Sequence, residues 1–192
     1  MGFIWADGNL SKEEDKISIR TSDYDLALKI FDVVSDKEKR KIYKQTYEKE
    51  AHNDSYMIIN TNKEVINSLK EFGITSRKSL TISFPKNIPS EYLGSFIRGY
   101  FDGDGCIYIS NTFKDKKYFA ISFSSGSELF INELKSVLFQ YFEIESTINK
   151  DKRVYGGYVL KIYKQENIKK IKNIFYENAS IFLERKYNIF CE

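Results

Sequence analysis

The chain has 192 residues, of which 42% are hydrophobic and 16% aromatic, so it can bury a substantial core in one domain or in two closely packed halves. Its single histidine argues against histidine-based catalysis, and its two cysteines match no metal-binding spacing, which favours free thiols in a reducing compartment. No apolar run is long enough to cross a membrane and no signal peptide is evident, so we expect a cytoplasmic protein without a membrane partner. The net charge of +3 is weak evidence for a nucleic-acid partner.

The first half of the chain alternates between helices and pairs of strands. Apolar residues spaced three or four apart predict helices, and alternating apolar residues predict strands. In chain order, the expected elements are a helix ending at Asp7, strands over residues 9–11 and 16–20, a helix capped by Ser22 or Asp23, strands over residues 40–47 and 55–60, and a helix that starts after Thr61 or Asn62 and ends at Gly73.

The second half repeats this order. Its expected elements are a helix over about residues 91–104, strands over 106–110 and 118–124, a helix capped by Ser127, strands over 145–149 and 155–163, and a helix over 166–175. The repetition predicts an internal duplication, with halves at residues 1–85 and 86–192. Strand alternation also predicts which residues point toward the helices: Ile17, Ile19, Ile107, Ile109, Phe119, Ile121, Phe123, Tyr158, Leu160 and Ile162.

Two short stretches, residues 2–8 and 99–105, share one pattern: small, large, large, variable, small, aspartate, glycine. The small residues, which recur four positions apart, are Gly2, Ala6, Ser95, Gly99 and Gly103. On a helix such residues line one face and let two backbones approach closely. We therefore expect the two helices to pair across a pseudo-two-fold axis, with Asp7 and Asp104 facing each other.

Asp7 and Asp104 would each end a helix, where the helix dipole disfavours an anion. Two such acids placed together need a cation, and Mg²⁺ suits them because it often binds through one or two carboxylates plus phosphates. Gly8 and Gly105 suit the left-handed residue that ends a helix. An Asp-Gly hairpin turn is the alternative, but it does not account for the small residues before it. An EF-hand is excluded, since its twelfth position, normally glutamate, would be Phe113.

These motifs resemble those of the LAGLIDADG homing endonucleases that carry two motifs in one chain. The resemblance extends to residues 76–85, 88–89, 96–105 and 183–187. It implies an α+β fold of two pseudo-symmetric αββαββα halves, whose antiparallel sheets form a concave saddle for DNA. It also implies a monomeric, site-specific endonuclease, associated with intron or intein mobility, that cuts both strands of double-stranded DNA. In that family the aspartate before the final glycine of each motif binds metal, which implies that Asp7 and Asp104 are catalytic and hold Mg²⁺ (or Mn²⁺).

One strand of the second half, residues 158–163, resembles the strand that carries a basic residue near the metal site in this family. Lys161 is therefore expected to be a third catalytic residue, which stabilises charge on the phosphate or positions water. The alternative is an ordinary lysine on the surface of a strand. In the first half the matching position is Ile59. We therefore expect the two DNA strands to be cut unequally.

The sheet faces that point away from the helices are expected to bind DNA, because a β-ribbon fits the major groove. A solvated polar face is the alternative interpretation. Residues 150–172 include eight basic and two acidic residues, which either contact phosphate or form a charged surface. The expected DNA contacts are Lys16, Ser18, Arg20, Lys78, Tyr108, Ser110, Ser122, Thr147, Lys161, Tyr163 and Lys186. Among these, Lys78 and Lys186 each follow an arginine near the end of a repeat and are assigned to phosphate groups.

The first motif departs from the family pattern. A complete motif helix would begin about two turns before Gly2, so we expect a shortened first helix, and full activity is not assured. Trp5 takes the place of a second motif acid, which is Asp102 in the other copy. Together with Ile59, these departures keep a second hypothesis open. The protein would then be a catalytically impaired DNA-binding protein of the same fold, either maturase-like or regulatory.

Overall fold

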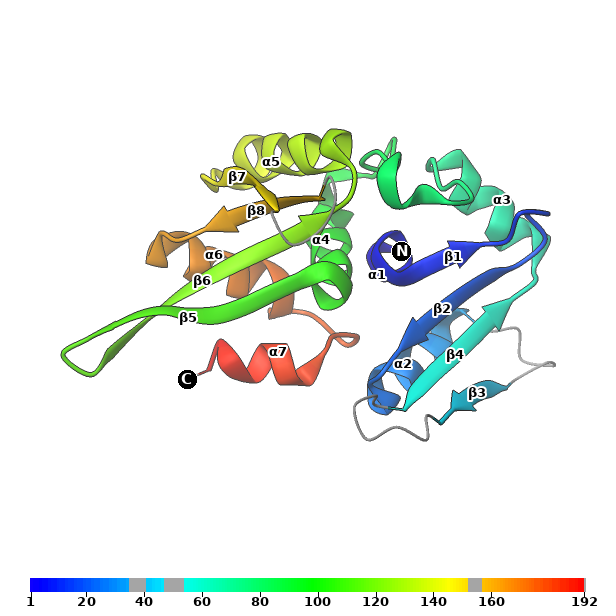
Figure 1. Ribbon diagram of the computed structural model, residues 1–192, viewed down its shortest axis with the longest axis horizontal. Helices are drawn as coiled ribbons and strands as arrows, with labels where there is room; N and C mark the ends of the chain where they lie inside the picture. Colours follow the sequence, from blue (N-terminus) through cyan, green and yellow to red (C-terminus); the bar gives the residue numbers. More distant parts are fainter. Residues whose placement is uncertain (35–40, 47–53, 152–156, 192) are drawn as a thin grey trace.

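A computed structural model describes residues 1–34, 41–46, 54–151 and 157–191. Two halves lie side by side, each with a four-stranded antiparallel sheet and helices packed on it (Figure 1). The predicted α+β fold with two αββαββα halves is confirmed. Residues 40, 47, 155 and 156, which belong to predicted strands, and His52 lie outside the described residues. Within the described ranges, no helix has the length and apolarity needed to cross a bilayer.

The two halves contain the same elements in the same order. The first half consists of α1 (Gly2–Asp7), β1 (Gly8–Leu10), β2 (Ile17–Thr21), α2 (Tyr24–Val34), β3 (Ile42–Gln45), β4 (Ser55–Asn60), α3 (Lys63–Glu71) and a short 3-10 helix (Lys78–Leu80). The second half consists of α4 (Ser90–Asp104), β5 (Gly105–Phe113), β6 (Lys116–Ser125), α5 (Glu128–Phe142), β7 (Thr147–Asp151), β8 (Gly157–Ile162), α6 (Gln165–Tyr176) and α7 (Glu184–Ile189). The predicted boundaries agree with these bounds within a few residues.

Side-chain caps define where three helices begin. Asp23 accepts a hydrogen bond at 2.8 Å from the backbone N–H three residues later, at the start of α2. Asn62 caps α3 at 2.8 Å, and Ser127 caps α5 at 3.3 Å. Of the two caps predicted for each helix, the structure thus shows Asp23 at α2 and Asn62 at α3. Gly73 follows α3 with a φ of 105°, the left-handed conformation that was expected to end this helix.

The two sheets have the same strand order, β1-β2-β4-β3 and β5-β6-β8-β7. Their registers also correspond. Ser18 on β2 pairs with Ile59 on β4, and Ser122 on β6 pairs with Lys161 on β8. Ile59 is therefore the structural counterpart of Lys161, as the alignment of the two halves predicted.

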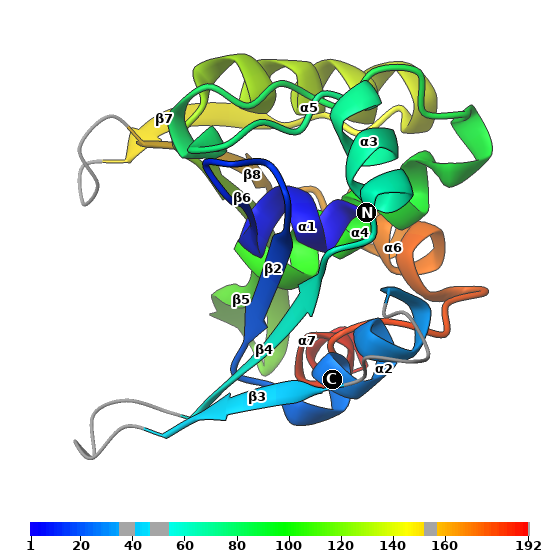
Figure 2. The ribbon, with the colours of Figure 1, turned by 90° about the vertical axis from the view of Figure 1, so that its right-hand side faces the viewer.

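Within the described ranges, the helices that pack on each sheet lie on one of its faces. Helix α2 packs on β2 and β4, and α5 and α6 pack on β6. Figure 2 shows the strands along one side of the molecule and α2 and α6 on the other. Predicted inward residues such as Ile17, Ile121 and Leu160 are buried between these layers. Ile109 is an exception at 44% exposure, because the long β5–β6 hairpin shifts register after this residue and projects beyond the helices (Figure 1).

The two motif helices differ in length. Helix α1 has six residues and α4 has fifteen. An apolar cavity of about 370 Å³ lies beside the first turn of α1, between this helix, α2 and α4. The side chains that line it include Met1, Leu26, Ile30 and Tyr92.

Gly8 and Gly105 do not adopt the left-handed conformation that was predicted for them. Their φ angles are −77° and −96°, and each helix passes directly into a strand. Glycine is needed at both positions because a side chain would not fit there, and not because of the backbone conformation. An ideal Cβ at Gly8 would lie 2.4 Å from the carbonyl oxygen of Ile4, and one at Gly105 would lie 2.5 Å from that of Phe101.

Candidate active site

The site is built on the contact between α1 and α4, which run side by side between the two sheets (Figures 1 and 2). An ideal Cβ at Gly2 would lie 1.9 Å from the carbonyl oxygen of Phe96, and one at Gly99 would lie 2.9 Å from a backbone nitrogen of α1. One at Gly103 would lie 2.4 Å from the Cβ of Ala6. Larger side chains cannot be placed here without moving a helix. The predicted pairing of the motif helices through small residues is therefore confirmed.

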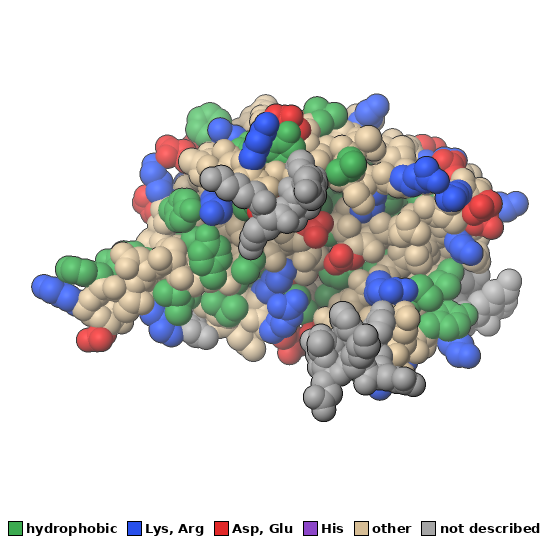
Figure 3. Space-filling view, viewed as in Figure 1, with side chains coloured by type: hydrophobic (Ala, Val, Ile, Leu, Met, Phe, Trp, Pro, Cys, Tyr) green, Lys and Arg blue, Asp and Glu red, His purple; other side chains and the backbone are tan. Residues whose placement is uncertain are grey.

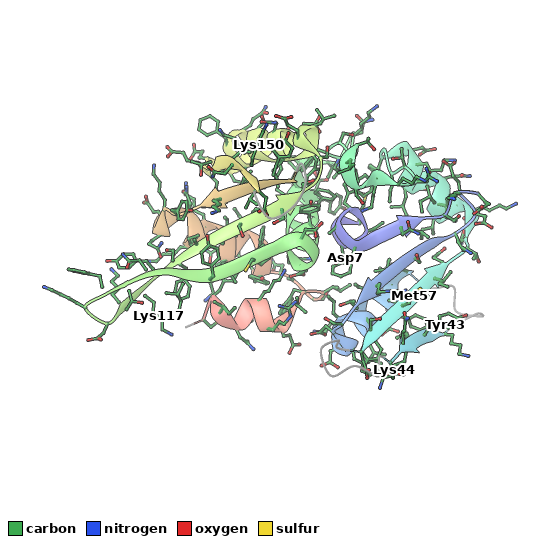
Figure 4. All side chains as sticks on the ribbon, viewed as in Figure 1. Asp7, Tyr43, Lys44, Met57, Lys117 and Lys150 are labelled. Atoms are coloured by element: carbon green, nitrogen blue, oxygen red, sulfur yellow. The ribbon has the colours of Figure 1, made fainter. Side chains whose placement is uncertain are left out.

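Asp7 and Asp104 end these two helices, and both side chains are exposed. Figure 4 shows Asp7 between the two sheets. Restricted hydration at the junction, and then the negative charge of Asp104, raise the pKa of Asp7 to about 6. Desolvation also raises the pKa of Asp104, whereas the positive charges of Lys78 and Lys186 oppose the shift in both acids. The two carboxylates are thus close enough to repel each other.

A hollow lies beside each acid. Asp7 borders one of about 350 Å³, which Arg20 and Arg185 also line. Asp104 borders another of about 290 Å³, together with Lys78. Figure 3 shows acidic atoms near the centre of this face with Lys and Arg side chains beside them. Arg185 was not predicted at this site. Its position before Lys186 repeats an Arg-Lys pair of the first half, and this repetition could have indicated it.

Lys78 and Lys186 are buried, at 7% and 5% exposure, which contradicts their predicted role as phosphate contacts. The Nζ of Lys78 donates hydrogen bonds to the carbonyl oxygens of Trp5 and Ala6, at 2.6 and 2.8 Å. The Nζ of Lys186 donates to those of Phe101, Asp102 and Gly105, at 2.6, 2.9 and 2.5 Å. The last carbonyl groups of a helix lack partners within the helix and lie at the negative end of its dipole. Each ammonium group is therefore drawn inward to a helix end.

The second motif acid differs between the halves. Trp5 is 1% exposed, and its indole N–H donates to the carbonyl oxygen of Ser83 at 3.0 Å. Asp102 is 4% exposed, and burial raises its pKa to about 6 against the opposing charges of Lys186 and Arg98. Both side chains therefore lie in the interior of their half, unlike the exposed carboxylate of Asp7.

The free face of the second sheet gathers most of the DNA contacts predicted for this half. Those on one face are Tyr108, Ser122, Thr147, Lys161 and Tyr163. Lys161 is half-buried and lines a hollow of about 500 Å³ with Tyr108 and Ser122. Thr147 is its neighbour across the strands, and the pKa of Tyr108 is raised by burial and then by the neighbouring Tyr163. Ser110 is exposed farther along the hairpin, and its hydroxyl donates to a backbone carbonyl at 2.9 Å.

The free face of the first sheet carries Lys16 just before β2, and Ser18 and Arg20 on it. A guanidinium nitrogen of Arg20 lies 3.9 Å from the sulfur of Met57, which pairs across the strands with Tyr43. Figure 4 shows Met57 and Tyr43 on neighbouring strands of the first sheet. The sequence interpretation missed Met57 and Tyr43, although strand alternation places both on this face.

The chemistry of Asp7 and Asp104 fits a divalent cation that prefers oxygen ligands. Mg²⁺ is commonly bound through one or two carboxylates, with water and phosphate completing its coordination, and Mn²⁺ also favours carboxylates and water. In the part of the chain that the structure describes, no group of three or more His, Cys, Asp or Glu side chains could hold a metal ion.

Comparison with known proteins agrees with this geometry. Residues 91–175 match the family model described as a LAGLIDADG-like domain. Over 191 residues the chain is 26% identical to the replication factor C small subunit of Methanocaldococcus jannaschii, covering 97% of this chain and 9% of that protein. Over 132 residues it is 36% identical to a probable translation initiation factor IF-2 of the same organism, covering 62% of this chain and 11% of that protein. The chain thus spans about a tenth of the length of these curated relatives.

Solved structures resemble nearly the whole chain. The meganuclease I-SmaMI bound to uncleavable DNA has a TM-score of 0.64 at 14% identity, covering 99% of this chain and 87% of its own. I-DmoI in complex with DNA and Mn has a TM-score of 0.57 at 17% identity, covering 93% and 94%. The N-terminal LAGLIDADG domain of DUF199/WhiA has a TM-score of 0.61 at 16% identity, covering 96% and 82%. Residues 91–175 are thus a LAGLIDADG-like domain, and the chain as a whole has the fold of the LAGLIDADG endonucleases.

Proposed function

We propose that this protein is a site-specific DNA endonuclease that makes a double-strand cut with the help of a divalent cation. One observation chiefly supports the proposal. The exposed carboxylates of Asp7 and Asp104 end two tightly paired helices and lie between two sheets, each with one face that no helix covers among the described residues. The same fold is seen in meganucleases solved with DNA.

Asp7 and Asp104 would hold the metal in this proposal. A bound Mg²⁺ or Mn²⁺ would supply an activated water and stabilise the leaving oxygen. Lys161 would stand on the adjoining sheet face, where its ammonium group can neutralise charge on the scissile phosphate or orient a water molecule. Arg20 and Arg185 border the hollow beside Asp7 and offer further positive charge to the DNA backbone.

The duplex would lie across the free faces of both sheets, with the predicted contacts Lys16, Ser18, Ser110 and Thr147 at its grooves. Basic and aromatic side chains of both halves then meet phosphates and base edges. Several phosphate contacts make affinity fall steeply as salt rises. Binding that is insensitive to salt would argue against this placement of the duplex. The two internal halves, divided near residues 85 and 86, would let one monomer contact both DNA strands.

The test is cleavage of a plasmid library that carries randomised target sites, followed by sequencing of the cut ends. We expect one recurrent cut sequence with Mg²⁺ and none with EDTA. Asp7→Asn and Asp104→Asn should each abolish cutting, whereas Asp115→Asn, which changes an exposed acid at the tip of the β5–β6 hairpin, should not. Cutting that survives in both motif variants would exclude these carboxylates as the active site.

A second function, specific DNA binding without cleavage, is favoured by one observation. Ile59 occupies in the first half the position that Lys161 occupies in the second, so only one half offers this lysine. Selection of bound sequences from the same library separates the two functions. Recovery of a specific sequence that is never cut, with any divalent cation, would support the binding function.

A further inference from the structure

The helix ends that carry Asp7 and Asp104 have an unusual electrostatic environment. The negative end of each helix dipole lies next to a carboxyl group, and a second carboxyl group stands close by. Without compensation, this arrangement would favour separation of α1 from α4. The glycine contacts hold the helices together at backbone distance, so the repulsion cannot be relieved by a small shift.

Lys78 and Lys186 place one buried ammonium group under each helix end. A lysine has three donors. Lys186 uses all three on backbone carbonyls, and Lys78 uses two on the last turn of α1. The two lysines occupy matching places after an arginine in the two halves, so the arrangement is duplicated together with the acids.

The negative charge of Asp7 acts on both lysines. Burial lowers the pKa of Lys78, whereas the negative charges of Asp104 and then Asp7 oppose this shift, and Lys78 borders the same hollow as Asp104. Burial lowers the pKa of Lys186 to about 8 and Arg185 adds to this shift, whereas the negative charges of the buried Asp102 and, less strongly, of Asp7 oppose it. Each acid of the junction therefore has a buried cation beside it.

We propose that Lys78 and Lys186 are positioning residues that act as internal counter-ions, so that the acid pair is held in place before any metal binds. Lys78 offsets the exposed pair, and Lys186 offsets Asp102 and Asp7. This inference deepens the proposed function. It rests on that function only for the statement that the acid pair serves to bind a metal. The cation that the bare carboxylates were expected to need for stability is thus built into the chain.

The test measures thermal unfolding of the full chain by circular dichroism, in EDTA and in about 10 mM Mg²⁺. Lys78→Met removes both the charge and the hydrogen bonds. Lys78→Gln keeps N–H donors and removes only the charge. Lys172→Met is the matched control, because Lys172 also caps a backbone carbonyl, that of Phe190 at 3.0 Å, but lies on α6.

In EDTA we expect Lys78→Met to lower Tm by roughly 10 °C, since removal of one partner of a buried charge cluster leaves the others uncompensated. Mg²⁺ should then raise the Tm of both Lys78 variants by at least about 5 °C more than it raises that of the wild type, because it replaces the lost charge. Lys172→Met should respond to Mg²⁺ like the wild type.

An equal response to Mg²⁺ in the wild type and in Lys78→Gln would overturn the proposal and leave Lys78 as a hydrogen-bonding cap alone. If Lys78→Met fails to fold in EDTA, Lys78→Gln carries the comparison. The readout is stability in the absence of DNA. A protein that never cuts DNA can therefore still pass this test, and a nuclease can fail it.

Discussion

Replacing Gly99 by alanine tests the contact on which the site depends. In the middle of a helix this change normally stabilises, by about 1 kcal/mol, because alanine has the higher helix propensity. Here the added Cβ would lie 2.9 Å from the backbone nitrogen of Phe3 and 3.2 Å from the Cα of Gly2. Both neighbours are backbone atoms, so no side-chain rotation can relieve the contact. The helices must separate, and the lost packing outweighs the gain in propensity.

The expected net cost is about 1–3 kcal/mol, the usual range for overpacking a tight contact. For a chain of this size that cost lowers Tm by roughly 2–12 °C. Gly94→Ala is the matched control on the same helix, because its Cβ would lie 2.8 Å from a side-chain methyl group (Cγ2) of Ile174 and would meet backbone only at 3.3 Å, at the carbonyl oxygen of Ile174. We expect this variant to stay within about 1 kcal/mol of the wild type.

The assay is thermal or urea unfolding of both variants under identical conditions. Gly99→Ala should also lose DNA cleavage, since a shift of α1 against α4 changes the separation of Asp7 and Asp104. Equal stability of the Gly99 and Gly94 variants would refute the reasoning, because it would show that the helix contact has room for a methyl group.

Two further predictions concern charge. Lys161→Met should slow the faster of the two strand cuts by roughly 10²–10³-fold, whereas Ile59→Lys should speed the slower one. Cleavage of a supercoiled plasmid followed over time measures both rates. If both strands are cut simultaneously and Lys161→Met has no effect, this lysine is an ordinary surface residue. Burial raises the pKa of Asp102 from 3.8 to about 6, so the native state binds this proton more tightly than the unfolded chain does, and stability falls as the pH rises from about 4 to about 6. Asp102→Asn should reduce this fall, measured as the change of Tm with pH in the absence of metal. If the change of Tm with pH stays the same, another group is responsible for it.

Much of the fold follows from patterns that are local in the chain. The duplicated motif predicted the paired helices, because small residues four apart face one side of a helix whatever surrounds it. Caps at Asp23, Asn62 and Ser127 depend on backbone groups two or three residues away. The match of Ile59 with Lys161 follows from strand order in two similar halves.

The directions of long side chains were decided only by the tertiary structure. Lys78 and Lys186 look like surface residues in the sequence, beside an arginine in each case. Their ammonium groups turn inward because two helix ends from distant parts of the chain present unpaired carbonyl groups within reach. The requirement for Gly8 is local by contrast, because a Cβ there would meet the carbonyl oxygen of Ile4 in the preceding helix, and it does not come from the φ of Gly8. A local pattern specifies which elements form, whereas the partner of a flexible charged group depends on which unsatisfied atoms the packed elements bring to it.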